Sequence, residues 1–529
     1  MKPMSLLVRT ALCLTAFFHL HSAQANNIQV ANTTLTNNTG STVLVQFDIS
    51  WENSWRGGGV ANWDAAWVFV KYKLPGDGGF SHARLEPTGH VAPGGSMIDI
   101  GLVSTGVAYN ASTNPVVGVF VRRDADGTGS FSANGVQLRW NYGALGYSMN
   151  DITEVRVFAV EMVYMNQAAF YLGSGGTETY AFHVNSSNAP YQVTSEAQIF
   201  LAASIVPGAL WADGEIETGT LPAAYPKGFA AAYMMKYEIS QQQYVDFLNS
   251  LTRVQQAAHV RTDLSVGVSS VTNRFVMSNS SLIHPYRNGI RCDAAIDPNS
   301  SITFYCDANG NGNGGEANDG QWIASGYATS IDVAAYLDWG ALRFMTELEY
   351  EKACRGPLPP LPNEFPWRTT TIKTGATTLN NAFTASEGVG TGYSATAGNA
   401  MYDLANGGFP IRVGAFAANI ANSGRITAGA GYYGTMELAG NMSELIISAG
   451  NAPGRAYTGV HGNGELTSTG GHDAANWPAA NAVDQFGSRG GSFGNSLDDR
   501  LRVSERIAAA SSNTASFAGN GVRGVRTAP

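Results

Sequence analysis

The chain has 529 residues, which is enough for two or three domains with a large core. Hydrophobic residues make up 44%, charged residues only 13%, and there are 62 glycines. This composition excludes a disordered chain, because disorder needs low hydrophobicity and high net charge, and it favours a fold rich in strands and loops. The formal net charge is −9 and no basic stripe is present, so we expect no nucleic-acid partner.

The first 25 residues are typical of a secretory signal peptide. Lys2 and Arg9 give a positive start, residues 11–20 are a short apolar run, and residues 23–25 read Ala-Gln-Ala, a small-x-small cleavage site. The apolar run is too short to span a membrane comfortably, and we expect no transmembrane segment elsewhere. The mature protein is therefore expected to be secreted, periplasmic or at the cell surface.

Residues 26–155 have the pattern of an antiparallel β-sandwich domain. Strand-like runs at residues 43–51, 67–72, 116–121 and 136–140 are separated by clusters of Gly, Asn, Asp and Pro. In the first and last of these runs, apolar and polar residues partly alternate, as in strands with one buried face.

Four tryptophans fall close together in this first domain. Trp51, Trp55, Trp63 and Trp67 either form a stacking platform for a sugar or belong to an aromatic core with a structured loop. We favour the aromatic core.

The remaining residues, 156–529, contain three strong helix signals. Ser240 with Gln243, and Thr346 with Glu349, form capping boxes ahead of apolar helical faces. Residues 330–339 are amphipathic and predict a third helix, with Ser330 as its cap.

Residues 255–325 resemble an insertion, rich in Asn, Ser and Gly. Cys292 and Cys306 flank a polar loop within it and are a plausible disulfide in an oxidising compartment. The sequence of Asp307, Asn309 and Asn311, followed by a glycine, matches the front half of a calcium loop, with a solvated Asn/Gly loop as the alternative.

Three further residues outside the insertion are assigned no chemistry. Cys354, in a helical run, is expected to be a buried thiol. His461 and His472 have no recognised metal-ligand spacing and are expected on the surface.

Six motifs then follow one another in a fixed order. They are Glu-Met-Val with Phe-Tyr-Leu-Gly-Ser (161–174), YMMKYEISQQQYVDFLN (233–249), LRFMTELEYEKACRG (342–356), Phe-Pro-Trp with Asn-Asn-Ala (365–382), GYYGTMELAGNMSEL (431–445), and Arg-Gly-Gly-Ser-Phe with Gly-Val-Arg (489–523). Together they resemble the formylglycine-generating enzymes, also called sulfatase-modifying factors. This resemblance implies an α+β, C-type-lectin-like fold for residues 156–529.

The resemblance also implies a structural calcium ion. In the family, an Asn after the Pro-Trp motif binds calcium, and so do the Asn and Glu of the Gly-Asn-x-x-Glu motif, together with nearby carbonyls. The matching residues are Asn381, Asn441 and Glu444, whose amide and carboxylate oxygens suit a hard cation.

The catalytic metal is expected to be missing. Catalytic members bind copper through two cysteines just after Arg-Gly-Gly-Ser, but here the segment 494–500 contains no cysteine. Copper(I) requires soft ligands, so we expect no copper. The related sulfoxide synthases bind iron through three histidines of a helical bundle that this sequence does not show, so we expect no iron.

We therefore expect an exported, non-catalytic binding or structural protein with an unknown protein or glycan ligand. The candidate ligand residues are Ser492, Asn495, Asp498, Asp499 and Arg500. The alternative is a formylglycine-generating or other oxidase enzyme that acts on a protein or peptide.

The four neighbouring arginines are given a structural role. Arg489, Arg502, Arg506 and Arg523 are expected to hold carbonyls and carboxylates in a loop-rich fold.

Overall fold

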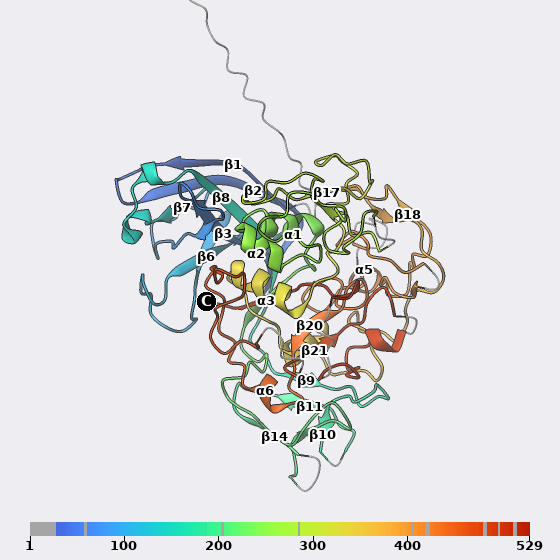
Figure 1. Cartoon of the computed structure of the whole chain (residues 1–529). Helices are drawn as coiled ribbons and strands as arrows, with labels where there is room; N and C mark the ends of the chain where they lie inside the picture. Colours follow the sequence, from blue (N-terminus) through green and yellow to red (C-terminus); the bar gives the residue numbers. More distant parts are fainter. Residues whose placement is uncertain are drawn as a thin grey trace, which may run out of the picture.

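The computed structural model describes residues 28–57, 61–185, 187–202, 206–283, 286–404, 407–417, 424–479, 484–495, 498–510 and 516–529 (Figure 1). The expected signal peptide, residues 1–25, lies outside the described residues. Within them the protein is α+β and rich in antiparallel strands, with few helices. No described helix has the length and apolar character needed to cross a bilayer.

The largest element is a ten-stranded sheet, whose main path runs β1-β2-β3-β8-β15-β22. Its strands are β1 (Gln29–Thr36), β2 (Val43–Gly57), β3 (Asn62–Lys73), β4 (Ser81–His82), β5 (Ser96–Leu102), β6 (Val116–Arg123), β7 (Gly127–Trp140), β8 (Glu154–Met165), β15 (Ala232–Met235) and β22 (Val525–Thr527). All of their pairings are antiparallel. The strands expected between residues 43 and 140 are therefore present.

The N-terminal strands enclose a core of their own. Val45 and Phe47 of β2 are fully buried and share a hydrophobic cluster with Val68 and Val70 of β3. The alternation of apolar and polar residues along β2 matches this arrangement, because successive side chains in a strand point to opposite faces.

β3 is buried on both of its faces. Val68 and Val70 face the N-terminal core, whereas the intervening Trp67 and Phe69 belong to a second, larger core. In the second core Phe69 packs edge-on against Trp339, with ring centroids 5.0 Å apart. The central strand thus joins the sheet to the helices.

β8 continues the sheet across the expected domain boundary at residues 155 and 156. It pairs with β3 along ten positions, from Glu154 opposite Lys73 to Val163 opposite Asp64. Its last residues also pair with β15. One sheet therefore connects the first domain to the rest of the chain.

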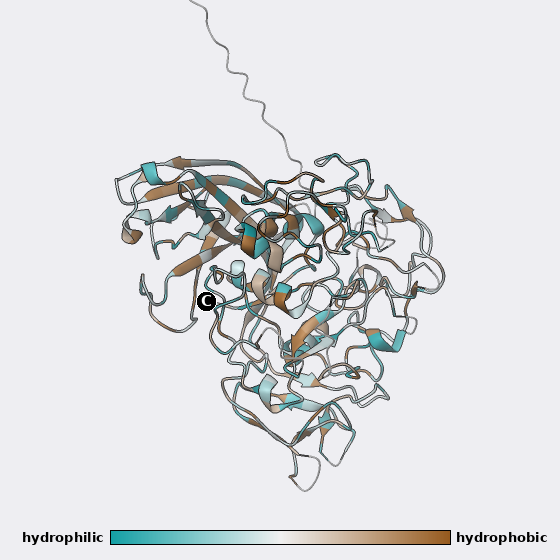
Figure 2. Cartoon of the chain, viewed as in Figure 1, coloured by the Kyte–Doolittle hydropathy of each residue, from teal (hydrophilic) through white to brown (hydrophobic). Residues whose placement is uncertain are grey.

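The described helices are α1 (Gln241–Leu248), α2 (Arg253–Ala258), α3 (Ser330–Trp339), α4 (Glu347–Arg355), α5 (Arg425–Ala428) and α6 (Ala452–Arg455). Helices α1, α2 and α3 lie next to this sheet, whereas α5 and α6 lie among the loops (Figure 1). Figure 2 shows apolar residues concentrated in the strands of the large sheet and in the helices next to it.

The capping boxes of α1 and α4 are confirmed. The Ser240 side chain accepts from the Gln243 amide, and the Thr346 side chain accepts from the Glu349 amide. In α3 the expected cap is wrong by one residue: Thr329 caps the helix, because its hydroxyl and Asp332 form the reciprocal box.

Most of the remaining chain consists of loops tied together by short strand pairs. These are β9 (Phe170–Leu172) with β11 (Tyr191–Val193); β10 (His183–Val184), β12 (Ile199–Leu201), β13 (Leu210–Trp211) and β14 (Gly219–Leu221); β16 (Ile290–Arg291) with β17 (Tyr305–Cys306); β18 (Leu379–Asn380) with β19 (Gly388–Val389); and β20 (Glu444–Ile447) with β21 (Phe486–Arg489). The β20–β21 pair carries the segment on which the functional prediction rests.

Candidate functional site

A cavity of about 350 Å³ opens beside β20 and β21. Its lining comes from both strands, from the segment after β21 and from the chain before β22: Ser443, Leu445, Ser488, Arg489, Gly490, Gly491, Ser492, Gly494, Asn495, Arg500, Glu505, Ile507, Ala508, Phe517 and Asn520. We call it the β20–β21 cavity. It is the one place where most of the predicted ligand residues meet.

Three of the five predicted residues line this cavity. Ser492, Asn495 and Arg500 are among its walls, whereas Asp498 and Asp499 are not. Asp498 instead lies 3.9 Å from the Arg502 guanidinium, as part of a short 3₁₀ helix.

Ser492 and Asn495 form a tight turn at the cavity wall. The Asn495 Oδ1 accepts from the Ser492 amide at 2.7 Å, and the Ser492 hydroxyl accepts from the Gly494 amide at 3.3 Å. The Asn495 carbonyl also accepts from the Asp403 amide at 2.7 Å. These bonds fix the turn and place a hydroxyl and an amide at its surface.

Arg500 is the cationic wall residue with spare donors. Its guanidinium makes no hydrogen bond or ion pair with the rest of the described chain, although its charge lowers the pKa of Glu505, and the residue is half-buried. Arg489, by contrast, is buried and its charge is neutralised by Glu347 at 3.3 Å and by Glu351 at 3.0 Å, although its Nε has no acceptor in the described chain. The available positive charge of the cavity is therefore that of Arg500.

Glu505 is the acidic residue among the described lining residues of the cavity. Burial raises its pKa, and its two oxygens accept from the Thr179 amide at 2.8 Å and the Ile507 amide at 3.3 Å. Because both oxygens already serve the backbone, Glu505 is part of the framework that shapes the cavity.

The lining supplies hydroxyl, amide and guanidinium groups beside an aromatic ring. Phe517 remains 49% exposed at the cavity. None of the described lining residues carries a thiol or an imidazole, so the donor set does not suit copper(I).

The expected disulfide is not formed in the structure. Cys292 and Cys306 are free, buried thiols. In the β16–β17 hairpin Cys306 lies opposite Ile290, so Cys292 lies two residues away along the partner strand. A diagonal pair of this kind is further apart than the 3.5–4.5 Å between Cβ atoms that a disulfide needs.

Cys354 is buried in α4, as expected. Burial raises the pKa of its thiol to about 12, which leaves the thiol protonated and unreactive at neutral pH.

The Gly-Asn-x-x-Glu motif leads into β20 and lies next to Arg523. The Asn441 amide is engaged on both sides, because it donates to Glu238 at 2.7 Å and accepts from the Ile411 amide at 3.0 Å. Glu444 accepts from Arg523 at 2.7 Å, and its second oxygen is buried without a partner in the described chain. Glu444 therefore keeps an oxygen that fits a cation, and Asn441 instead anchors the loop.

The other predicted calcium residues are engaged by protein groups. Asp307 is ion-paired with Arg291, and the Asn309 amide donates to Glu316 at 2.9 Å. The Asn311 amide donates to the same carboxylate, so this segment is a loop closed by its own side chains.

Asn381 is exposed and has a left-handed backbone, with φ of 51°. Across the described residues, no three His, Cys, Asp or Glu side chains come together in a way that could hold a metal ion.

The structure also places residues that the sequence analysis missed. His461, expected on the surface, is 3% exposed; it contacts the Val103 carbonyl at 2.9 Å and accepts from the Thr527 amide at 2.9 Å. In the cavity, Glu505, Phe517 and Asn520 were not predicted. Their spacing after Arg-Gly-Gly-Ser-Phe gives no local signal, because they reach the site through loops.

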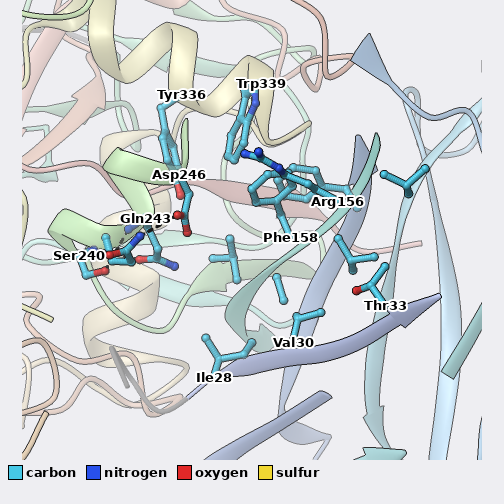
Figure 3. Close-up of a pocket in the computed structure, with 16 residues that line it drawn as sticks. Ile28, Val30, Thr33, Arg156, Phe158, Ser240, Gln243, Asp246, Tyr336 and Trp339 are labelled. Carbon is cyan, nitrogen blue, oxygen red and sulfur yellow. Dashed lines mark hydrogen bonds between the residues drawn. The ribbon is translucent and has the colours of Figure 1, made fainter. Parts of the chain in front are cut away.

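A second cavity, of about 330 Å³, lies between the N-terminal strands and the helices α1 and α3. Figure 3 shows Ile28, Val30 and Thr33 of the N-terminal segment on one side, with Tyr336 and Trp339 of α3 on the opposite side. It contains none of the predicted site residues.

The polar groups at this second cavity already have structural roles. Ser240 and Gln243 form the capping box of α1, and Arg156 pairs with Glu154 at 2.7 Å. We therefore assign it no ligand.

No protein-family model matches the chain, and no curated protein is significantly similar to it.

Proposed function

We propose that the protein is an exported, non-catalytic binding protein that holds a partner protein or a glycan in the β20–β21 cavity. On this proposal residues 156–529 are a lectin-like scaffold of the sulfatase-modifying-factor type, and the N-terminal sheet is a spacer or a second contact surface. The observation that carries the proposal is the meeting of Ser492, Asn495 and the unpaired Arg500 in one cavity.

Arg500 supports binding more directly than the other lining residues do. A guanidinium with free donors recognises a carboxylate or carbonyl through paired hydrogen bonds. Phe517 adds an exposed aromatic surface next to it, and aromatic and arginine side chains together are typical of binding sites.

The test is site-specific crosslinking. A photoreactive amino acid at position 517 should capture a partner from the protein's native surroundings, and Arg500→Ala should reduce the yield at least tenfold without changing the melting temperature. The control places the same amino acid at Phe200, which is 57% exposed on β12. Equal capture at both positions, or no effect of Arg500→Ala, would contradict the proposal.

The alternative function, an oxidase acting on a protein or peptide, can be distinguished from binding by an activity assay. Protein supplied with copper and a cysteine-containing peptide should consume no oxygen and form no aldehyde. Oxygen-dependent conversion of the peptide thiol would establish the enzyme instead.

A structural calcium ion belongs to the same proposal, with the free oxygen of Glu444 as a ligand. Chelation by EDTA should then lower the melting temperature by several degrees, because an ion bound only to the native state stabilises it. Added calcium should restore the original value. Glu316→Gln, in the Asp307 loop, should leave this response unchanged, and a melting temperature that ignores EDTA would argue against the ion.

A further inference from the structure

A third cavity, of about 280 Å³, lies where the end of β2 meets residues 425–436. Trp55 of β2 forms one wall, and Tyr432 and Tyr433 form part of the other. Trp51 and Trp67 are in the cores, with 1% and 0% exposure, but Trp55 remains half-buried at this cavity. Two tryptophans of the cluster, Trp51 and Trp67, are therefore core residues, whereas Trp55 lines the cavity.

Trp55 is held in place from several sides. Its indole nitrogen donates to the Asn62 side chain at 3.0 Å, and the Lys236 ammonium lies 4.8 Å from its ring centre. Gly434, with φ of +93°, passes so close that an added Cβ would be 2.7 Å from the indole. The ring is therefore fixed before any ligand arrives.

The two cations at the cavity already donate to protein groups. Lys236 bonds Glu161 at 3.0 Å and Asp64 at 3.2 Å. Arg425 donates to two backbone carbonyls at 2.9 and 2.7 Å. Both cations are therefore occupied by protein groups, and none of the described lining residues carries a carboxylate that would attract a cationic ligand. The cavity therefore suits a neutral ligand.

Polar groups remain available for such a ligand. The exposed side chain of Asn53 lies at the cavity, beside the half-buried Asn62. Tyr433 is 1% exposed, and its hydroxyl has no hydrogen-bond partner in the described part of the chain. A buried hydroxyl without a partner is costly, and a ligand hydroxyl would satisfy it.

From these observations we infer that the cavity binds a neutral saccharide. A pyranose ring has an apolar C–H face that packs on aromatic rings such as Trp55 and Tyr432, and equatorial hydroxyls that bond amides and the Tyr433 hydroxyl. The volume of about 280 Å³ lies just below the usual range for ligand pockets, which begins at roughly 300 Å³, and this favours a terminal sugar unit. The site shares no residue with the β20–β21 cavity and so does not depend on the proposed function.

The experiment titrates the full chain with the methyl glycosides of glucose, galactose, mannose and N-acetylglucosamine, followed by calorimetry and saturation-transfer NMR. At least one glycoside should bind. Trp55→Ala and Tyr432→Ala should abolish the signal. Tyr433→Phe should weaken binding roughly tenfold, the value of one hydrogen bond, while keeping or raising the melting temperature, because it removes an unpaired hydroxyl.

Phe200→Ala, which removes an exposed aromatic ring elsewhere, is the matched control and should bind like the original protein. The absence of binding by all four glycosides would overturn the inference, as would unchanged affinity in Tyr433→Phe. Tyr433→Phe also decides the question if Trp55→Ala does not fold. Loss of sugar binding in Arg500→Ala alone would move the sugar to the β20–β21 cavity, overturning this inference while leaving the proposed function intact.

Discussion

Two arginines that lie 23 positions apart in the same C-terminal segment have different surroundings. Arg523 is 1% exposed and donates to Glu444 at 2.7 Å and to the carbonyls of Met235 and Met436 at 2.8 Å each. Arg500 has no such partners. The structural role expected for Arg523 therefore has a physical basis, whereas Arg500 is available to a ligand.

Arg523→Ala should accordingly lower the free energy of unfolding by about 3 kcal/mol or more, because it leaves the buried Glu444 carboxylate without its partner. Arg500→Ala should change it by less than ~0.5 kcal/mol, as surface substitutions usually do. Urea denaturation of both variants makes the comparison. Similar losses in the two would contradict the assignment of Arg500 to ligand binding.

Asp338 of α3 gives a test based on pH. Burial raises the pKa of its carboxyl to about 7, although it accepts from the Asn463 amide at 2.9 Å and the Asp473 amide at 2.8 Å. A carboxyl group with a raised pKa binds its proton more tightly in the folded state. Its contribution to stability is therefore present at low pH and is lost as the pH rises from about 4 to about 7.

Asp338→Asn should remove this dependence, which amounts to at most ~1.4 kcal/mol per pH unit. The measurement is the free energy of unfolding of both proteins at several pH values within that window. Parallel curves for the two proteins would show that Asp338 does not titrate there.

At the scale of elements, the β16–β17 hairpin shows why spacing alone misled the disulfide prediction. Cys292 and Cys306 are 14 positions apart, which is compatible with a crosslink, but the register of the hairpin places Ile290, and not Cys292, opposite Cys306. Burial raises the pKa of both thiols, which also slows their oxidation.

All three thiols of the described chain should therefore react with Ellman's reagent after denaturation without a reductant, and none should react in the native protein. Cys354→Ser provides the calibration, because it should reduce the denatured count by one thiol. A denatured protein in which two of the three fail to react would establish the disulfide.

The helices could be predicted because their signals are local. A capping box such as that of Thr346 and Glu349 lies within four residues and specifies where the helix begins. The cavity could be predicted in part, since Ser492, Asn495 and Arg500 belong to one motif. Phe517 and Ser443 could not, because only the pairing of distant segments brings them there.

On the scale of the whole molecule, β3 and β8 link the N-terminal core to the larger core. β3 contributes Val68 to one core and Trp67 to the other. Unfolding of this strand would therefore expose both cores to water. The Arg526 guanidinium adds a link, since it donates to the Leu102 carbonyl and lies 4.2 Å from the Trp67 ring centre.

Calorimetry should consequently record a single cooperative unfolding transition for the full chain, with no separate melting of residues 26–155. Fluorescence and circular dichroism should give the same midpoint. Two resolved transitions would show that the N-terminal strands are an independent domain.

The pairing of β15 (Ala232–Met235) with β22 (Val525–Thr527) also constrains when the fold can be completed. The chain is synthesised from its N-terminus, so β15 leaves the ribosome long before β22, the strand that covers its edge. Until residues 525–527 have been made, β15 has an open side, and Arg523 cannot yet reach Glu444. Nine of the ten strands precede residue 236, so most of the sheet can form during synthesis, but its last strand, β22, can be added only when synthesis is nearly complete.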